Sequence, residues 1–173
     1  MVHFYAFFLA DNSININHRG FFEEKGVKRL LFLLIPLFLI GCSQPEIKEI
    51  KEGKRHLQNV NLTGADLSKL DMQHVDLTNS NLKNTNLTES NLAYAKLVNA
   101  NFQAANCQYA NFQNTDCRGA DFISANLEGT NFEGANLTNA RFIGTNVKKT
   151  NFRNTTGLND DQKARLKSKG AIF

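Results

Sequence analysis

Proline is almost missing from this sequence of 173 residues, where it occurs only at positions 36 and 45. None lies between residues 57 and 156, so nothing in this stretch removes a backbone N–H donor from a hydrogen-bonded ladder. The middle of the chain is therefore compatible with an uninterrupted β architecture.

An excess of charge is also missing from the middle of the chain. Residues 57–156 carry eight basic and eight acidic side chains, so they contribute nothing to the formal net charge of +4. A protein that binds nucleic acid concentrates basic residues on its binding domain. The balance argues against a nucleic-acid partner.

The residue patterns of common enzyme and metal sites are absent. The histidines at positions 3, 18, 56 and 74 have no ligand spacing, and the sequence contains no Cys-x-x-Cys, no glycine-rich phosphate loop and no nucleophile elbow. We therefore expect no enzyme activity, no catalytic residue, no metal site and no cofactor.

No apolar run is long enough to span a bilayer as a helix. Residues 30–40 form an eleven-residue run that contains Pro36, whereas a spanning helix needs ~20 residues. The run follows the basic pair Lys28 and Arg29, as the apolar region of a signal peptide does. We therefore expect residues 1–41 to be a signal-peptide region.

The apolar run ends in Leu39-Ile40-Gly41-Cys42, which resembles the lipobox of bacterial lipoproteins. The resemblance implies that Cys42 is acylated, becomes the new N-terminus and binds the protein to a membrane through its lipid. It also implies a position on the periplasmic face of the bacterial cell envelope, and Ser43 in place of Asp indicates the outer membrane. A plain secretory signal and a buried helix with an unrelated cysteine are the alternatives.

Residues 1–26 precede the expected signal peptide, although signal peptides begin at the start of a chain. One interpretation is that translation starts at Val27, through a GUG codon. The codons for the preceding Glu23 to Gly26 are purine-rich and could hold a ribosome-binding sequence. The other interpretation is a genuine additional N-terminal segment, and the nucleotide sequence decides between them.

Apolar residues recur every five positions through the middle of the chain, a period that neither a helix nor a strand produces. Asn or Asp precedes each of them with three exceptions, and Ala, Ser or Thr usually stands two positions before. These apolar positions, which we call central, hold Leu, Phe, Met, Cys or Val at 57, 62, 67, 72, 77, 82, 87, 92, 97, 102, 107, 112, 117, 122, 127, 132, 137, 142, 147 and 152.

This pattern resembles the pentapeptide-repeat family. The resemblance implies an all-β fold, a right-handed quadrilateral β-helix over residues 57–156 with about five coils, in which each pentapeptide forms one side. Coils that stack at strand spacing, ~4.8 Å each, make a rod roughly 24 Å long. Asn and Asp suit the bends because they accept left-handed backbone conformations and bond nearby backbone groups.

In such a coil, residues twenty apart stack on one wall and residues ten apart face each other across the lumen. Close packing cannot admit four phenylalanines per coil, so we expect them on two opposite walls. Cys107 and Cys117 face each other roughly 10 Å apart, too far for a disulfide, and are interpreted as small core residues. The expected structural core is Phe102, Phe112, Phe122, Phe132, Phe142 and Phe152.

The outer positions offer little chemistry. Asp66, Asp71 and Asp76 follow one another around the first coil, so they diverge and cannot form a catalytic pair. Ile123 and Ile143 stack one coil apart on the exterior and could belong to a partner-binding patch.

The N-terminal end of the repeat region departs from the pattern. Val60, Leu70 and Val75 replace the usual small residue, which predicts distorted first coils. Residues 42–56 are expected to be the lipidated cysteine and a linker.

The C-terminal end, residues 157–173, loses the five-residue register. Asn159 can cap a short helix, with Gln162 completing a capping box, and Gly170 suits its end. Apolar residues such as Leu166 would cover the open edge of the last coil. We expect a short C-terminal capping helix.

These features together predict a lipid-anchored envelope protein that acts as a non-enzymatic scaffold or protein-binding surface. Its protein partner and oligomeric state are not specified by the sequence. The resemblance suggests one alternative function, a DNA mimic that binds topoisomerases and protects them from quinolones. Those relatives present an acidic face, whereas residues 57–156 are electrically balanced.

Overall fold

The structure is a computed structural model of the 173-residue chain, and it describes residues 45–173. The chain divides into two units, Met1–Gly41 and Cys42–Phe173, and all the described residues belong to the second. The expected signal-peptide region and the lipid-attachment residue Cys42 lie outside the described residues. Within residues 45–173, no helix is long and apolar enough to cross a membrane.

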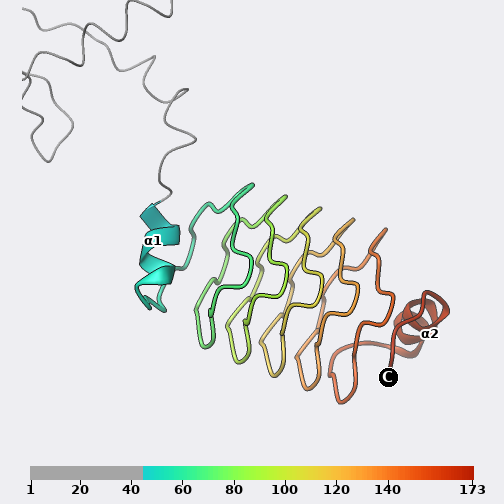
Figure 1. The fold of residues 1–173 in the computed structure, drawn as a ribbon. Coiled ribbons are helices and arrows are strands. Elements are labelled where there is room, and N and C mark those ends of the chain that lie inside the picture. The colour runs from blue at the N-terminus through green and yellow to red at the C-terminus, as the bar shows by residue number, and fades with distance from the viewer. Residues whose placement is uncertain (1–44) are drawn as a thin grey trace, which may run out of the picture. The chain divides into compact units, whose positions relative to one another are not determined.

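The five-residue repeats form a solenoid of stacked turns (Figure 1). Parallel β-bridges join residues twenty apart, from His56 with Asp76 to Asn136 with Thr156. The backbone N–H of Leu62, for example, donates to the carbonyl oxygen of Asn81 at 2.8 Å. Four pentapeptides therefore complete one turn, which makes the predicted β-helical solenoid the architecture of the repeat region. We number its sides 1 to 4 by their first central residues, Leu57, Leu62, Leu67 and Met72.

Pairing occurs one residue at a time, and the described residues contain no extended strand. The reason is the corner that follows each central residue, such as the turn in which the N–H of Ala65 donates to the carbonyl of Leu62 at 3.0 Å. With a corner in every pentapeptide, only the residue before the central one is left to form a bridge.

Asn occupies two different places in the repeat. The Asn or Asp before each central residue forms the bridges. The left-handed residue stands two positions after the central one, where φ lies between 54° and 71° from Asn59 to Asn154. Asn and Gly are frequent there because they tolerate this conformation best.

Apolar side chains fill the interior of the solenoid. The central residues are at most 3% exposed except Phe142, which is half-buried in the last turn. Most side chains two positions before them are buried too, and the hydroxyls among them bond backbone carbonyls, as Thr130 Oγ1 does with Cys107 at 2.6 Å. The interior is therefore a packed core.

The phenylalanine rings stack in two columns along the axis. Phe102 lies over Phe122 with ring centroids 4.9 Å apart and an interplanar angle of 8°. Across the interior, Phe112 meets Phe122 edge-on at 77°. Stacking within a column and edge-to-face contact between columns are the two preferred aromatic geometries, so all six rings form one cluster.

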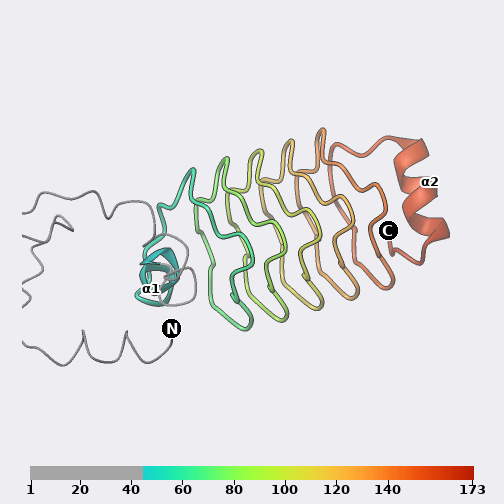
Figure 2. The ribbon, with the colours of Figure 1, turned by 90° about the horizontal axis from the view of Figure 1, so that it is seen from above.

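A helix that we did not expect, α1 (Pro45–Lys51), lies in the segment assigned to the linker. Proline suits its first position, and the chain turns away at Gly53, where φ is +86°. Ile50 is 2% exposed and belongs to the core cluster, against which Ile47 also packs. The helix therefore covers the N-terminal end of the solenoid (Figure 2).

Helix α2 (Asp160–Ser168) covers the other end (Figure 2). The expected capping box is present, since the Asn159 side chain accepts the N–H of Gln162 and the Gln162 side chain accepts the N–H of Asn159. Leu166 is buried, and the ring of Phe173 stacks on Phe152 with centroids 5.4 Å apart. The last residues thus extend one aromatic column by one ring.

Candidate functional site

The Asn and Asp residues that form the bridges also brace the corners. At seventeen of the twenty positions their Oδ1 atom accepts the backbone N–H two residues later, for instance from Gln113 to Asn111 at 3.0 Å. The three exceptions are His56, Lys96 and Arg141, which have no carboxylate or amide oxygen at this place. This repeated polar contact is structural and explains the Asn-rich composition.

The candidate acids of the first turn do not converge. Asp66, Asp71 and Asp76 lie on sides 3, 4 and 1, where they bridge to Asn86, Asn91 and His56. The backbone N–H of Gln73 donates to Asp71 and holds the pKa of that carboxyl below its usual value. Among residues 45–173, no group of three or more His, Cys, Asp or Glu could hold a metal ion. These carboxylates act as corner acceptors.

The two cysteines of the repeat region are inert core residues. Cys107 and Cys117 are free and fully buried. Burial raises the pKa of Cys117 to about 12 and that of Cys107 further above its ordinary value. The neutral thiol is a poor nucleophile. Cys117 Sγ instead lies 3.2 Å from the hydroxyl of Thr115 inside the core.

Charge is spread evenly over the four sides. Sides 1 to 4 carry two, one, three and two acidic residues and two, two, three and one basic residues, so none departs from neutrality by more than one charge. Cross-turn ion pairs such as Arg141 Nη1 to Asp121 Oδ2, at 3.1 Å, neutralise several of them. The exterior therefore has no acidic face.

Three large apolar or aromatic side chains are exposed on the sides. Ile143 is 69% exposed, Tyr109 60% and Tyr94 53%. Ile143 lies on side 2, one turn after the half-buried Ile123, while Tyr94 stacks on His74 with ring centroids 5.2 Å apart. Isolated exposed groups of this kind form small contact points, and only the Ile pair is contiguous along one side.

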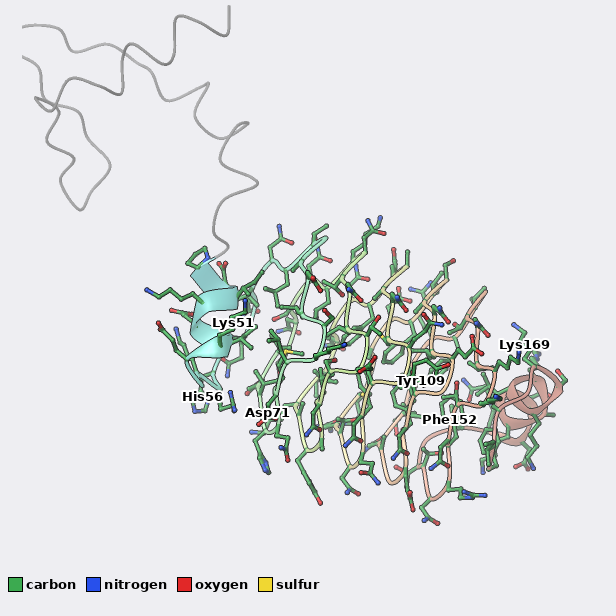
Figure 3. All side chains as sticks on the ribbon, viewed as in Figure 1. Lys51, His56, Asp71, Tyr109, Phe152 and Lys169 are labelled. Atoms are coloured by element: carbon green, nitrogen blue, oxygen red, sulfur yellow. The ribbon has the colours of Figure 1, made fainter. Side chains whose placement is uncertain are left out.

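A pocket of about 280 Å³ lies between α1 and the first turn of the solenoid. Lys51, Arg55 and Lys69 supply three basic groups to its lining, and Asp71 is its only acid. Figure 3 labels Lys51 at the end of α1 and Asp71 on the first turn. The pocket was not predicted from the sequence because the segment that forms α1 was assigned to a linker. The available signal was the cluster of four basic residues in the segment Lys48–Arg55.

The family comparison agrees with this architecture. The model of the pentapeptide repeats matches residues 55–84, 80–116 and 115–154, with eight copies. These matches cover more than half of the chain, and the chain belongs to the pentapeptide-repeat family. No curated protein matches the sequence significantly.

Solved structures of other pentapeptide-repeat proteins resemble the chain. HetL from the cyanobacterium Nostoc sp. strain PCC 7120, involved in heterocyst differentiation regulation, is 28% identical over 64% of this chain with a TM-score of 0.58. The match spans 51% of HetL, about half of its length. The protein alr5209, also from Nostoc, is 22% identical over 75% of this chain and 94% of its own, with a TM-score of 0.53. QnrB1, a plasmid-mediated fluoroquinolone resistance protein, is 18% identical over 61% of this chain and 67% of its own, with a TM-score of 0.31.

Proposed function

We propose that the protein is a lipid-anchored, non-enzymatic scaffold of the bacterial cell envelope, held at the periplasmic face of the outer membrane and presenting a rigid side to a protein partner. The observation that carries the proposal is the solenoid itself: a packed interior, a helix over each end and near-neutral sides. Such a rod offers extended flat sides for contact rather than a cleft for substrate.

The anchor follows from Cys42 and its surroundings in the sequence. One acyl chain gives only marginal membrane binding, whereas a processed lipoprotein carries two or three, enough for stable attachment. Only two residues separate Cys42 from α1, so the lipid would hold the N-terminal end of the solenoid close to the bilayer.

Metabolic labelling with radioactive palmitate tests the anchor. Wild-type protein is expected to take up the label, fractionate with outer membranes and begin at Cys42 when mature. Cys42→Ser should abolish the label, whereas Cys107→Ser and Cys117→Ser, at buried core positions, should retain it. Unlabelled, soluble wild-type protein in a host that processes lipoproteins would contradict both the proposed lipid anchor and the proposed location in the cell envelope.

Photo-crosslinking from single surface positions tests the scaffold role. A crosslinking residue in place of Ile143, the most exposed large apolar side chain, should capture one defined envelope protein, while one in place of Asn114 on side 4 should not. The same pattern of capture from all four sides would contradict a dedicated binding side.

A DNA-mimic function has no support from the charge distribution described above, and the similarity to QnrB1 is too low to argue for it. Purified protein is therefore expected neither to inhibit DNA gyrase supercoiling nor to relieve its inhibition by quinolones. Inhibition at micromolar protein would favour the mimic over the scaffold.

A further inference from the structure

The pocket between α1 and the first turn combines positive charge with an apolar floor. Its basic groups come from three places in the chain: Lys51 ends α1, Arg55 follows the turn at Gly53, and Lys69 occupies a corner of side 3. The half-buried Leu70 supplies the accessible apolar part, since Ile50, which also lines the pocket, is only 2% exposed. The pocket is therefore a feature of the folded end of the rod.

Arg55 is the basic group most in need of a partner. Its Nη1 atom is buried, and no acceptor within residues 45–173 lies at hydrogen-bond distance from it. Leaving a charged donor buried and unsatisfied costs free energy, typically more than the 1–3 kcal/mol of a neutral group. Nη1 has almost no accessible surface, so an anion in the pocket would offset this cost through attraction to the guanidinium charge as a whole.

Neighbouring acidic side chains do not neutralise the positive charge of the pocket lining. Asp71 is the single carboxylate in the lining, against three bases. Lys69 Nζ lies 3.8 Å from Glu89 Oε2, but both side chains are more than half exposed, and such pairs contribute little. The lining therefore keeps an excess of two positive charges, which matches a doubly charged anion.

We propose that this pocket binds a phosphate ester, with the phosphate on Arg55, Lys51 and Lys69 and the organic part against Leu70. Guanidinium groups bind phosphate through paired N–H donors in a planar fork, and lysine adds mobile point charges. A purely inorganic anion would leave the apolar floor uncovered.

Two sources could supply this chemistry, a lipid headgroup or a soluble phosphate ester. Eight residues lie between Cys42 and Lys51, which an extended chain could span over at most ~30 Å, so an anchored protein has the pocket within reach of headgroups. This source rests on the proposed lipid anchor, whereas binding of a soluble ester does not.

Titration calorimetry on the full-length chain in detergent tests the pocket, with inorganic phosphate and glycerol 3-phosphate as probes. Both should bind, the ester more tightly. Arg55→Gln should weaken binding about tenfold or more, the loss expected for one charge-assisted contact, and the exposed Lys69→Gln about threefold. Lys149→Gln is the matched control, because Lys149 occupies the same corner of side 3 as Lys69 at the far end of the solenoid.

Equal losses in Lys69→Gln and Lys149→Gln would mean general attraction to positive charge and would overturn the proposal, as would absence of binding by the wild type. Should Arg55→Gln unfold the first turn, seen as a lowered thermal midpoint, the variant of the exposed Lys69 still tests the proposal.

Vesicles with phosphatidylglycerol that displace glycerol 3-phosphate identify the headgroup as the source. Displacement by soluble esters alone identifies a free ligand, and either result is independent of palmitate labelling at Cys42.

Discussion

The two halves of the solenoid fill the same interior in different ways. Central positions 57 to 97 hold only Leu and Met, and the residues two positions before them include Val60, Leu70 and Val75. From position 102 onward, phenylalanine occupies two walls and the residues two positions before the central ones are Ala or Thr. Large neighbours thus occur only beside Leu or Met and phenylalanine only beside small neighbours, although the second turn combines Leu with Ser, Thr and Ala.

This comparison corrects the expected distortion of the first coils. The bridges begin at His56 and continue with the same spacing of twenty, and φ at the first corners, 59° at Asn59 and 69° at Gly64, matches that of later ones. Val75 is fully buried, and Val60 and Leu70 pack against the core. These three larger side chains are therefore accommodated beside Leu and Met without distortion of the backbone.

Phe122→Ala should have the largest effect on stability, because it removes a fully buried ring from the middle of the aromatic half. Phe122 stacks on both Phe102 and Phe142 and meets Phe112 and Phe132 edge-on. We expect a loss of ~3–5 kcal/mol in the free energy of unfolding, measured with urea.

Ile123→Ala provides the control for this prediction, since it alters the next residue on the outside of the same side. Little change in the urea midpoint is expected for it. Equal losses for the two variants would show that the assignment of inward and outward positions is wrong.

Exchanging small and larger residues at equivalent positions tests the volume rule directly. Val75 and Ala135 occupy the same place on side 1, three turns apart. Val75→Ala should leave a cavity in the aliphatic half and Ala135→Val should overpack the aromatic half, each lowering stability by about 1–3 kcal/mol. A neutral Ala135→Val in thermal unfolding would mean that the aromatic half holds spare volume.

The corners distinguish the halves in a second way. Gly64 is the only glycine among the nine left-handed positions from 59 to 99, whereas four of the eleven from 104 to 154 are glycine, namely Gly119, Gly129, Gly134 and Gly144. Gly144→Ala should cost about 1 kcal/mol, since a Cβ in this conformation is strained even though its nearest neighbour, Ser124 Oγ, lies at 3.4 Å.

The reverse exchange at Ala104, in the same column with φ of 54°, should raise stability by roughly 0.5 kcal/mol. Chemical denaturation of both variants measures the pair. A stabilising Gly144→Ala would show that the strain lies elsewhere in the corner.

Lowering the pH should destabilise the half with Leu and Met at central positions 57 to 97 before the other half. This is the smallest of the four expected effects on stability. Three of the five aspartates at bridge positions lie in this half, Asp66 and Asp71 in the first turn and Asp76 at the start of the second. The N–H of Gln73 lowers the folded-state pKa of Asp71, so this carboxylate stabilises the fold above its unfolded pKa of about 4 and the contribution is lost as the pH falls through the lower folded value.

The thermal midpoint is therefore expected to fall below about pH 4, and Asp71→Asn should reduce that fall because the amide oxygen accepts the same bond at every pH. Hydrogen exchange should show the first turns opening before the last. Loss of protection that begins at the C-terminal turns would contradict this order.

The fold could be predicted from the sequence because its cause is local and repeated. Each pentapeptide contains its own inward residues, and most contain their own hydrogen-bond acceptor for the corner, so the same local structure is predicted for every repeat. The exceptions can also be identified in the sequence, since His56, Lys96 and Arg141 are the positions without the corner hydrogen bond. The cap at Asn159 was predictable because a capping box is also a local pattern.

The pocket could not be predicted in the same way, because it depends on contacts between different parts of the chain. Pro45–Lys51 is only seven residues long and reads as polar linker, and its helix is held by Ile50 in the core. Short helices of this kind form through tertiary packing rather than propensity. A pattern likewise shows which residues recur but not which of them has positive φ.

The pairing of residues twenty apart also constrains how such a chain can change length during evolution. Duplication of a whole turn inserts twenty residues and leaves every later residue on its original side, so a binding side would simply become longer. Duplication of a single pentapeptide also preserves the repeat, but it moves each later residue to the next side and would place Ile123 and Ile143 on different sides if it fell between them. Insertions of other lengths interrupt the ladder, so selection on a contact side would favour gains and losses of complete turns.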